Sequence, residues 1–283
     1  MIEKTIDDKP PKAGFTLWLA AVGTLFAVCA PLPGWAADMP MQCEAISPTN
    51  RVALVELYTS EGCSSCPPAD KWLSALSASG LGANKVLPLA LHVDYWDYIG
   101  WKDPFAMSRF TKRQEAVAVR NRSRSIYTPQ VVLDGLDWRQ WWEPAPFLKQ
   151  VNRINQESAS LNLTLSGRWQ PGVDMSAKVS ARVAPVTDTN DSKRETLHLA
   201  VFENQLETRV LRGENAGETL RHDAVVRAWI DPVVLRQSAG ELLNKVVRLP
   251  TNIKPENMGL AAFVQDIQGD VVQAVSCLFK PET

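Results

Sequence analysis

The sequence is poor in the features that mark metal-binding, nucleic-acid-binding or membrane proteins. Its three histidines, His92, His198 and His222, are too far apart in the sequence to form a metal-ligand pair. The 30 lysines and arginines nearly balance 31 aspartates and glutamates, and the net charge is -1. Because neither sign of charge is in excess, the composition gives no global electrostatic reason to bind nucleic acid or an anionic membrane. Internal repeats and low-complexity tracts are lacking as well.

Long hydrophobic runs are also lacking. The apolar stretch at residues 15–30 is shorter than the ~20 residues of a membrane-spanning helix. It follows a lysine-bearing N-terminus and precedes a segment rich in Pro, Gly and Ala, an order that is typical of a secretory signal. We predict a signal peptide over residues 1–37, cleaved after Ala36, and a periplasmic or secreted protein with no membrane contact after cleavage.

Cysteine is scarce, with five residues in the chain. Cys29 lies in the predicted signal, and its removal leaves Cys43, Cys63, Cys66 and Cys277, an even number that suits an oxidising compartment. Four cysteines can pair in several ways, and one of these pairings keeps the CxxC pair together and joins Cys43 to Cys277. This pairing predicts a disulfide bridge between the start of the mature chain and its last strand. The alternative is that Cys43 and Cys277 are two unpaired, buried thiols.

The most informative motif is the CxxC pair of Cys63 and Cys66, which lies between an apolar strand pattern and a helix start. Such a turn brings two sulfurs within bonding distance, and the helix N-terminus favours the thiolate that attacks a disulfide. The spacing also fits a structural bridge or half of a zinc site, although zinc normally needs a second CxxC or a histidine pair. We predict thiol–disulfide chemistry, with Cys63 as the exposed attacking sulfur and Cys66 as the resolving one, because Gly62 leaves room for a bulky disulfide.

Two prolines limit where the helix after the motif can start. Pro67 and Pro68 lack N–H groups, and a helix tolerates such residues in its first turn. We therefore expect the helix to begin at about Ser64 or Ser65, with a serine hydroxyl as its cap.

The remaining pattern predicts two kinds of architecture. The elements expected first are a strand at 52–58, a helix through 69–76, a strand at 85–93, a helix at 104–120, a strand at 130–133, a tight turn at 134–135 and a helix through 147–154. From residue 161 onward, alternating apolar residues predict six to eight strands of a small β-sandwich. We predict an α/β domain over residues 38–159, followed by a smaller all-β sandwich-like domain over residues 160–283.

Three segments of the first domain carry a resemblance to known proteins. Their sequences are VALVELYTSEGCSSCPPAD, HVDYWDYIGWKDPF and IYTPQVV. Together with the order of strands and helices, they resemble the thioredoxin fold, and more closely a bacterial family of exported thioredoxin-like proteins that is mostly of unknown function. The resemblance covers residues 50–160 closely and implies that the α/β domain is thioredoxin-like.

The resemblance implies further site residues. In thioredoxin-like proteins a cis proline packs against the active-site disulfide, and the residue before it offers backbone groups to an extended substrate; these positions map onto Pro129 and Thr128. A buried acid that helps to deprotonate the resolving thiol maps onto Glu56, whose pKa burial would raise. The alternative for Glu56 is an exposed glutamate at the sheet edge.

Aromatic residues follow the second predicted strand. Because ligands of parallel sheets bind beyond the carboxyl ends of the strands, Tyr95 and Trp96 are expected to share an edge with the CxxC turn and to line a groove for a peptide. The alternative is a packed aromatic plug. The basic stretch at 109–124 is predicted to be a solvated helix face, and the polar segment at 212–223 is either a loop that docks on the redox domain or an ordinary hairpin.

These observations predict an exported thiol–disulfide oxidoreductase whose partners are protein thiols, protein disulfides or a redox partner protein, with no cofactor, metal or nucleic acid. The dipeptide between the cysteines, Ser64-Ser65, leaves reductase, oxidase and isomerase chemistry open. One alternative is a binding or scaffold protein in which the CxxC disulfide is structural. Another is a copper-handling protein in which His92 joins the thiolates.

Overall fold

The computed structural model describes residues 39–172, 174–186, 194–235 and 241–282. The predicted signal peptide, residues 1–37, lies outside these residues. The described residues are mostly β, with 44% in strands and 18% in helices. Within the described ranges, no helix combines the length and the apolar character needed to cross a membrane.

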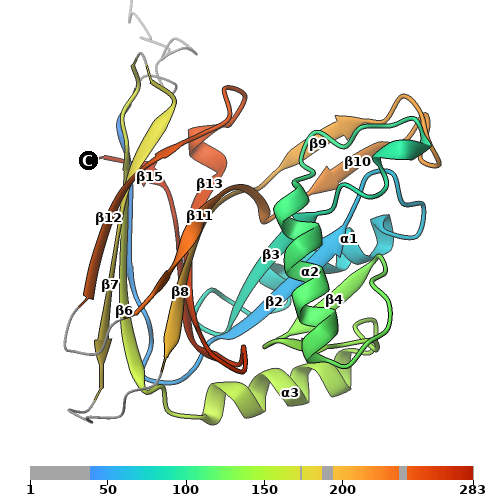
Figure 1. Cartoon of the computed structure of the whole chain (residues 1–283). Coiled ribbons are helices and arrows are strands. Elements are labelled where there is room, and N and C mark those ends of the chain that lie inside the picture. Colours follow the sequence, from blue (N-terminus) through green and yellow to red (C-terminus); the bar gives the residue numbers. More distant parts are fainter. Residues whose placement is uncertain (1–38, 173, 187–193, 236–240, 283) are drawn as a thin grey trace, which may run out of the picture. The chain divides into compact units, whose positions relative to one another are not determined.

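Two large sheets contain most of the strands (Figure 1). The eight-stranded sheet has the order β14 (Val271–Leu278), β13 (Met258–Asp266), β8 (Glu195–Glu203), β11 (Val225–Val234), β3 (Val86–His92), β2 (Ala53–Thr59), β4 (Gln130–Leu133) and β5 (Leu136–Asp137). The five-stranded sheet has the order β12 (Glu241–Arg248), β7 (Ser176–Pro185), β6 (Leu161–Trp169), β1 (Met41–Ile46) and β15 (Lys280–Pro281).

The other elements are a separate hairpin and a few helices. The hairpin consists of β9 (Leu206–Arg209) and β10 (Thr219–His222), which pair with each other. The α-helices are α1 (Pro67–Ala78), α2 (Ser108–Arg120) and α3 (Pro144–Gln156), and the short 3-10 helices are η2 (Asp97–Ile99) and η3 (Pro255–Asn257). All three α-helices lie on the same side of the molecule, together with β2, β3 and β4 (Figure 1).

The predicted fold class, an α/β thioredoxin-like domain followed by a smaller all-β sandwich-like domain, is wrong. The chain is mostly β, and strands from both halves belong to one sheet, because β3 pairs in parallel with β11 through Ala90 and Val225. The core follows the sheet, since Leu57 of β2 lies in the same buried cluster as Phe202 and Phe263. Hydrophobic periodicity identifies strands but does not show which distant strand each one pairs with.

The two large sheets pack face to face over a second buried cluster. Leu163 and Leu165 of β6 lie in this cluster with Leu199 of β8. A disulfide between Cys43 of β1 and Cys277 of β14 links the two sheets, with a Cα–Cα distance of 5.6 Å and a sequence separation of 234. The predicted pairing is confirmed, and the alternative of two unpaired thiols is wrong.

Candidate functional site

The CxxC motif lies in the turn between β2 and α1. Cys63 and Cys66 form a disulfide with a Cα–Cα distance of 5.4 Å, as predicted. The helix begins later than expected: Cys66 is its N-cap residue, no side chain caps it, and Pro67 and Pro68 take the first two helical positions. The prediction of a start at Ser64 or Ser65 is wrong because these residues belong to the turn that closes with the hydrogen bond from Cys66 N–H to the Cys63 carbonyl.

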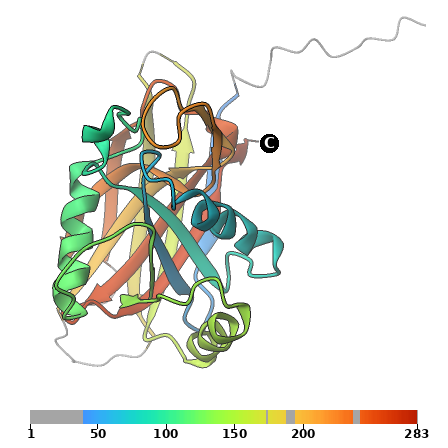
Figure 2. The same cartoon turned by 90° about the vertical axis from the view of Figure 1, so that its right-hand side faces the viewer.

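Both cysteines of the motif are 0% exposed. The prediction that Cys63 is an exposed sulfur is therefore wrong for this conformation. One segment that covers the turn lies about 150 residues further along the chain, between β9 and β10. Residues 213–217 of this segment, called the cap loop below, contact the CxxC turn. In Figure 2 the orange β9–β10 hairpin lies beside the blue turn that leads into α1.

The cap loop is held to the CxxC turn by three hydrogen bonds. The side-chain amide of Asn215 donates to the carbonyl oxygens of Glu61, at 2.8 Å, and of Cys63, at 3.1 Å. The Glu214 carboxylate accepts a hydrogen bond from the N–H of Ser64 at 3.0 Å. Asn215 is buried, whereas Glu214 and Ser64 are exposed. Asn215 is thus the residue of the cap loop that is buried against the CxxC turn.

The other side of the turn is covered by Trp96. A Cβ atom at Gly62 would lie 3.1 Å from Trp96 Cβ and 3.3 Å from Ile99 Cδ1. Gly62 therefore permits close packing of these side chains rather than the approach of a substrate. The indole N–H of Trp96 donates to Thr128 Oγ1 at 2.8 Å, and the peptide bond between Thr128 and Pro129 is cis, as the resemblance implies. Trp96 thus connects the CxxC turn to the cis proline segment.

Tyr95 and Trp96 are partly buried and pack against the core. Burial raises the pKa of Tyr95. This packing favours the alternative of an aromatic plug, and a role of these residues in peptide binding stays a prediction.

A cluster of buried acids and histidines lies beneath the CxxC turn. Its members are Glu61, Asp70, His92, Asp103 and His222. His92 Nδ1 lies 2.7 Å from Asp103 Oδ2, His222 Nε2 lies 3.3 Å from Glu61 Oε1, and His222 Nδ1 lies 3.7 Å from Asp70 Oδ2. The two imidazole rings are 5.0 Å apart. The cluster reaches both ends of the motif, because Glu61 precedes Cys63 by two residues and the N–H of Asp70 bonds to the Cys66 carbonyl.

The charges in the cluster shift one another's pKa values. Burial opposes ionisation of Asp103, but the His92 imidazole beside it outweighs burial and lowers the pKa of Asp103. Burial likewise opposes protonation of His92, but Asp103 outweighs it and raises the pKa of His92. Burial raises the pKa of Asp70, although His222, His92 and a hydrogen bond with Thr59 oppose this shift. The cluster therefore places titratable groups with shifted pKa values close to the CxxC pair.

Sequence reasoning missed most of this cluster. Glu61 and Asp70 could have been found, because each is close in sequence to a cysteine of the motif. His222 and Asn215 lie in the polar segment at 212–223, for which a docking loop is one of the two predicted alternatives. The contacts of both residues with the CxxC turn favour that alternative, although the sequence does not single out these two side chains.

Glu56 is buried, so the alternative of an exposed edge glutamate is wrong. Its carboxylate forms an ion pair of 2.5 Å with Arg113 of α2 and lies 3.4 Å from the hydroxyl of Tyr58. Glu61 and Asp70 are the buried acids that lie next to the CxxC motif in the sequence, and the role of Glu56 in deprotonating the resolving thiol stays a prediction. Arg113 also departs from the predicted solvated helix face, since it is largely buried and lies over the ring of Trp229.

The described residues contain no group of three or more His, Cys, Asp or Glu side chains arranged to hold a metal ion. His92, which the copper-handling alternative would recruit, is fully buried, and its Nδ1 is engaged with Asp103.

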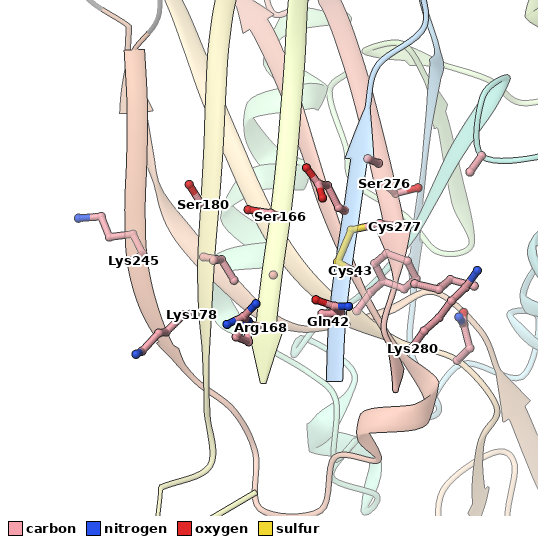
Figure 3. Close-up of a pocket in the computed structure, with 18 of the residues that line it drawn as sticks. Gln42, Cys43, Ser166, Arg168, Lys178, Ser180, Lys245, Ser276, Cys277 and Lys280 are labelled. Atoms are coloured by element: carbon pink, nitrogen blue, oxygen red, sulfur yellow. A yellow bond between two sulfur atoms is a disulfide. The ribbon is translucent and has the colours of Figure 1, made fainter. Parts of the chain in front are cut away.

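A cavity of about 1080 Å³ lies elsewhere, along the five-stranded sheet, with the Cys43–Cys277 disulfide in its wall (Figure 3). The cations that line it do not converge. Figure 3 shows Lys178 and Lys245 pointing away from Lys280. The CxxC turn, where a disulfide and buried acids and histidines do converge, remains the candidate site.

These features define a two-sheet, mostly β protein that carries a covered CxxC disulfide above a buried acid–histidine cluster. The chain belongs to the DUF1223 family, proteins of unknown function, whose family model matches residues 54–265. The prediction that the chain belongs to a family of unknown function is therefore confirmed. No curated protein matches this chain significantly.

Two solved structures are similar to this one. Protein AGR_C_4864 from Agrobacterium tumefaciens has 24% sequence identity and a TM-score of 0.51, with 82% of this chain and 96% of that chain covered. HBP35 of Porphyromonas gingivalis has 13% identity and a TM-score of 0.63, with 81% of this chain and 76% of that chain covered. At these identities the similarity concerns the fold.

Proposed function

We propose that this protein is an exported thiol–disulfide oxidoreductase that acts on protein thiols or disulfides through Cys63 and Cys66. One observation carries the proposal: the two sulfurs are bonded across the start of α1, directly above buried acids and histidines. A helix N-terminus stabilises a thiolate, and the cluster offers groups that can accept or donate the protons of the exchange.

The proposed location is the periplasm or the outside of the cell. Two disulfides join all four cysteines of the described residues. Disulfides persist in oxidising compartments and are rare where glutathione and thioredoxin keep thiols reduced. The predicted signal peptide supports the same location.

In the reducing direction, the Cys63 thiolate attacks a substrate disulfide, forms a mixed disulfide and releases one substrate thiolate, which takes up a proton. Cys66 then loses its proton, attacks the Cys63 sulfur and releases the second substrate thiolate. Two electrons pass from the cysteine pair to the substrate, and the Cys63–Cys66 disulfide is restored. The oxidising direction consists of the same steps in reverse. The dipeptide Ser64-Ser65 leaves reductase, oxidase and isomerase chemistry open.

A second candidate function is a binding or scaffold protein in which the CxxC disulfide is permanent. The observation that favours it is the complete burial of both cysteines. A structural disulfide of this kind would exchange slowly and would have a reduction potential below about -300 mV.

The two functions differ in the fate of a Cys66→Ala variant. If the protein is an oxidoreductase, this variant should form a stable mixed disulfide through Cys63 with oxidised glutathione and with a disulfide-bonded model protein such as insulin, detectable by mass spectrometry. A double variant, Cys63→Ala with Cys66→Ala, is the matched control and should form none. If the Cys66→Ala variant leaves Cys63 as a free thiol under the same conditions, the proposed oxidoreductase function is contradicted.

A further inference from the structure

We propose that the cap loop, residues 213–217, is an intramolecular stand-in for a partner protein: it occupies a docking surface beside the CxxC pair, and a polypeptide segment of the partner reaches Cys63 by replacing it. This inference rests on the proposed oxidoreductase function, and it explains how a fully buried disulfide can take part in exchange.

The contacts of the cap loop are those that another polypeptide could make. Two of its three hydrogen bonds end on backbone carbonyls, those of Glu61 and Cys63, and the third comes from the backbone N–H of Ser64. A partner segment in which an asparagine or glutamine is next to an aspartate or glutamate can bind the same three backbone groups. The surface therefore fits an acidic, amide-bearing segment of polypeptide.

The cap loop also covers apolar surface. A Cβ atom at Gly213 would lie 3.2 Å from Trp101 Cβ and 3.5 Å from Ile99 Cδ1, so the loop backbone packs directly on these side chains. Displacing the loop uncovers Trp101 and Ile99 next to the disulfide. An apolar side chain of the partner can then take the place of the loop backbone, since burial of apolar surface drives most protein–protein association.

The construction of the hairpin allows the loop to move while the strands stay in place. Among the described strands, β9 and β10 pair with each other and with no strand of the two large sheets. Val210 and Leu220, which flank the loop, are buried and fix the body of the hairpin. Gly213 and Gly217, at the two ends of the cap loop, have φ values of 78° and 90° and provide hinges. Asn215 is the one buried residue between them.

The test of the cap is the rate at which dithiothreitol reduces the Cys63–Cys66 disulfide in the mature protein. The variant Glu214→Ala with Asn215→Ala removes the side-chain hydrogen bonds of the loop. The control variant Glu218→Ala with Thr219→Ala changes two exposed residues of the same hairpin. Each lost hydrogen bond shifts the opening equilibrium by roughly fivefold, so we expect reduction to be at least about tenfold faster in the first variant and within about twofold of wild type in the control.

Equal rates of disulfide reduction in wild type and in the loop variant would contradict the proposal that the loop covers the disulfide. Because Asn215→Ala alters a buried position, the single variant Glu214→Ala, which changes an exposed residue and removes the acceptor of the Ser64 N–H, keeps the test valid if the double variant does not fold. It should accelerate reduction in the same direction but by less. The two proposals can fail separately. If these variants are reduced faster but the Cys66→Ala variant forms no mixed disulfide, the oxidoreductase function is contradicted, whereas the covering role of the loop is supported.

The stand-in role is tested with a synthetic peptide of residues 211–219. Added to the loop variant at millimolar concentration, this peptide should slow reduction of the disulfide, because it can rebind the vacant surface. The same peptide carrying Asn215→Ala should have little effect. If neither peptide changes the rate, the surface under the loop does not accept a polypeptide in trans and the proposed docking role is overturned.

Discussion

The two disulfides of this protein occupy different settings. The Cys43–Cys277 bridge joins strands of the two large sheets across 234 residues of sequence, whereas the Cys63–Cys66 bridge closes a turn between residues that are three apart. Buried acids and histidines lie beneath the CxxC turn, and a polar loop covers it. The comparison teaches that the long bridge links distant parts of the fold, whereas the short bridge lies among titratable groups, where the proposed chemistry would take place.

The largest expected effect is on stability. A bridge over a long stretch of chain restricts the unfolded state more than a bridge over a short one. Replacing Cys43 and Cys277 by serine should lower the free energy of unfolding by roughly 2–5 kcal/mol, and replacing Cys63 and Cys66 by about 2 kcal/mol or less. Urea unfolding of the two double variants measures this. A larger loss for the CxxC variant would contradict the division of roles.

A second prediction separates the two regions by pH. His198 stacks on Phe263 with ring centroids 4.7 Å apart, away from the CxxC turn. Burial, together with the positive charges of Arg113 and Arg120, lowers the pKa of His198 to about 3. In the unfolded chain histidine titrates near pH 6.5. As the pH falls from 8 to 5, the unfolded state therefore gains a proton that the folded state does not bind, and stability drops by about 2 kcal/mol.

The variant His198→Phe keeps an aromatic ring at this position and removes the titrating group. Its free energy of unfolding should lose about 2 kcal/mol less than that of wild type between pH 8 and pH 5. The same pH dependence in both proteins would show that His198 is not held neutral.

A third, smaller effect has the opposite sign and belongs to the CxxC region. The pKa of His92 is raised, because Asp103 outweighs the effect of burial. Its contribution to stability is fully present below pH 6.5, the ordinary value for histidine, and is lost as the pH rises through the raised pKa. Unfolding of wild type and Asp103→Asn between pH 6 and pH 9 measures this. The variant should be less stable at pH 6 and should vary less with pH; a steeper slope in the variant would contradict the pairing.

Local structure could be predicted from the sequence, and pairing between distant segments could not. The strand predicted at 52–58 is found at 53–59, and the strand at 130–133, the helix through 147–154 and both disulfides follow from periodicity and cysteine arithmetic. Asp134 and Gly135 form the expected tight turn, with φ values of 50° and 86°. These features depend on neighbouring residues, which the sequence displays directly.

The features that the sequence did not show depend on contacts across long separations. The pairing of Ala90 with Val225 merges strands that had been assigned to separate sheets. The same hairpin region brings Asn215 and His222 to the CxxC turn and buries Cys63, which had been expected to be exposed. The motif therefore predicted the Cys63–Cys66 disulfide, but not the segment that covers it.

The most direct test of the account follows both disulfides in one experiment. The mature protein is equilibrated in glutathione buffers of increasing reducing strength, thiols are alkylated, and the reduced fraction of each pair is read by mass spectrometry. The account predicts that Cys63–Cys66 is reduced reversibly at a potential above about -300 mV, while Cys43–Cys277 remains oxidised. A CxxC pair that stays oxidised in every buffer, as the long bridge does, would contradict it.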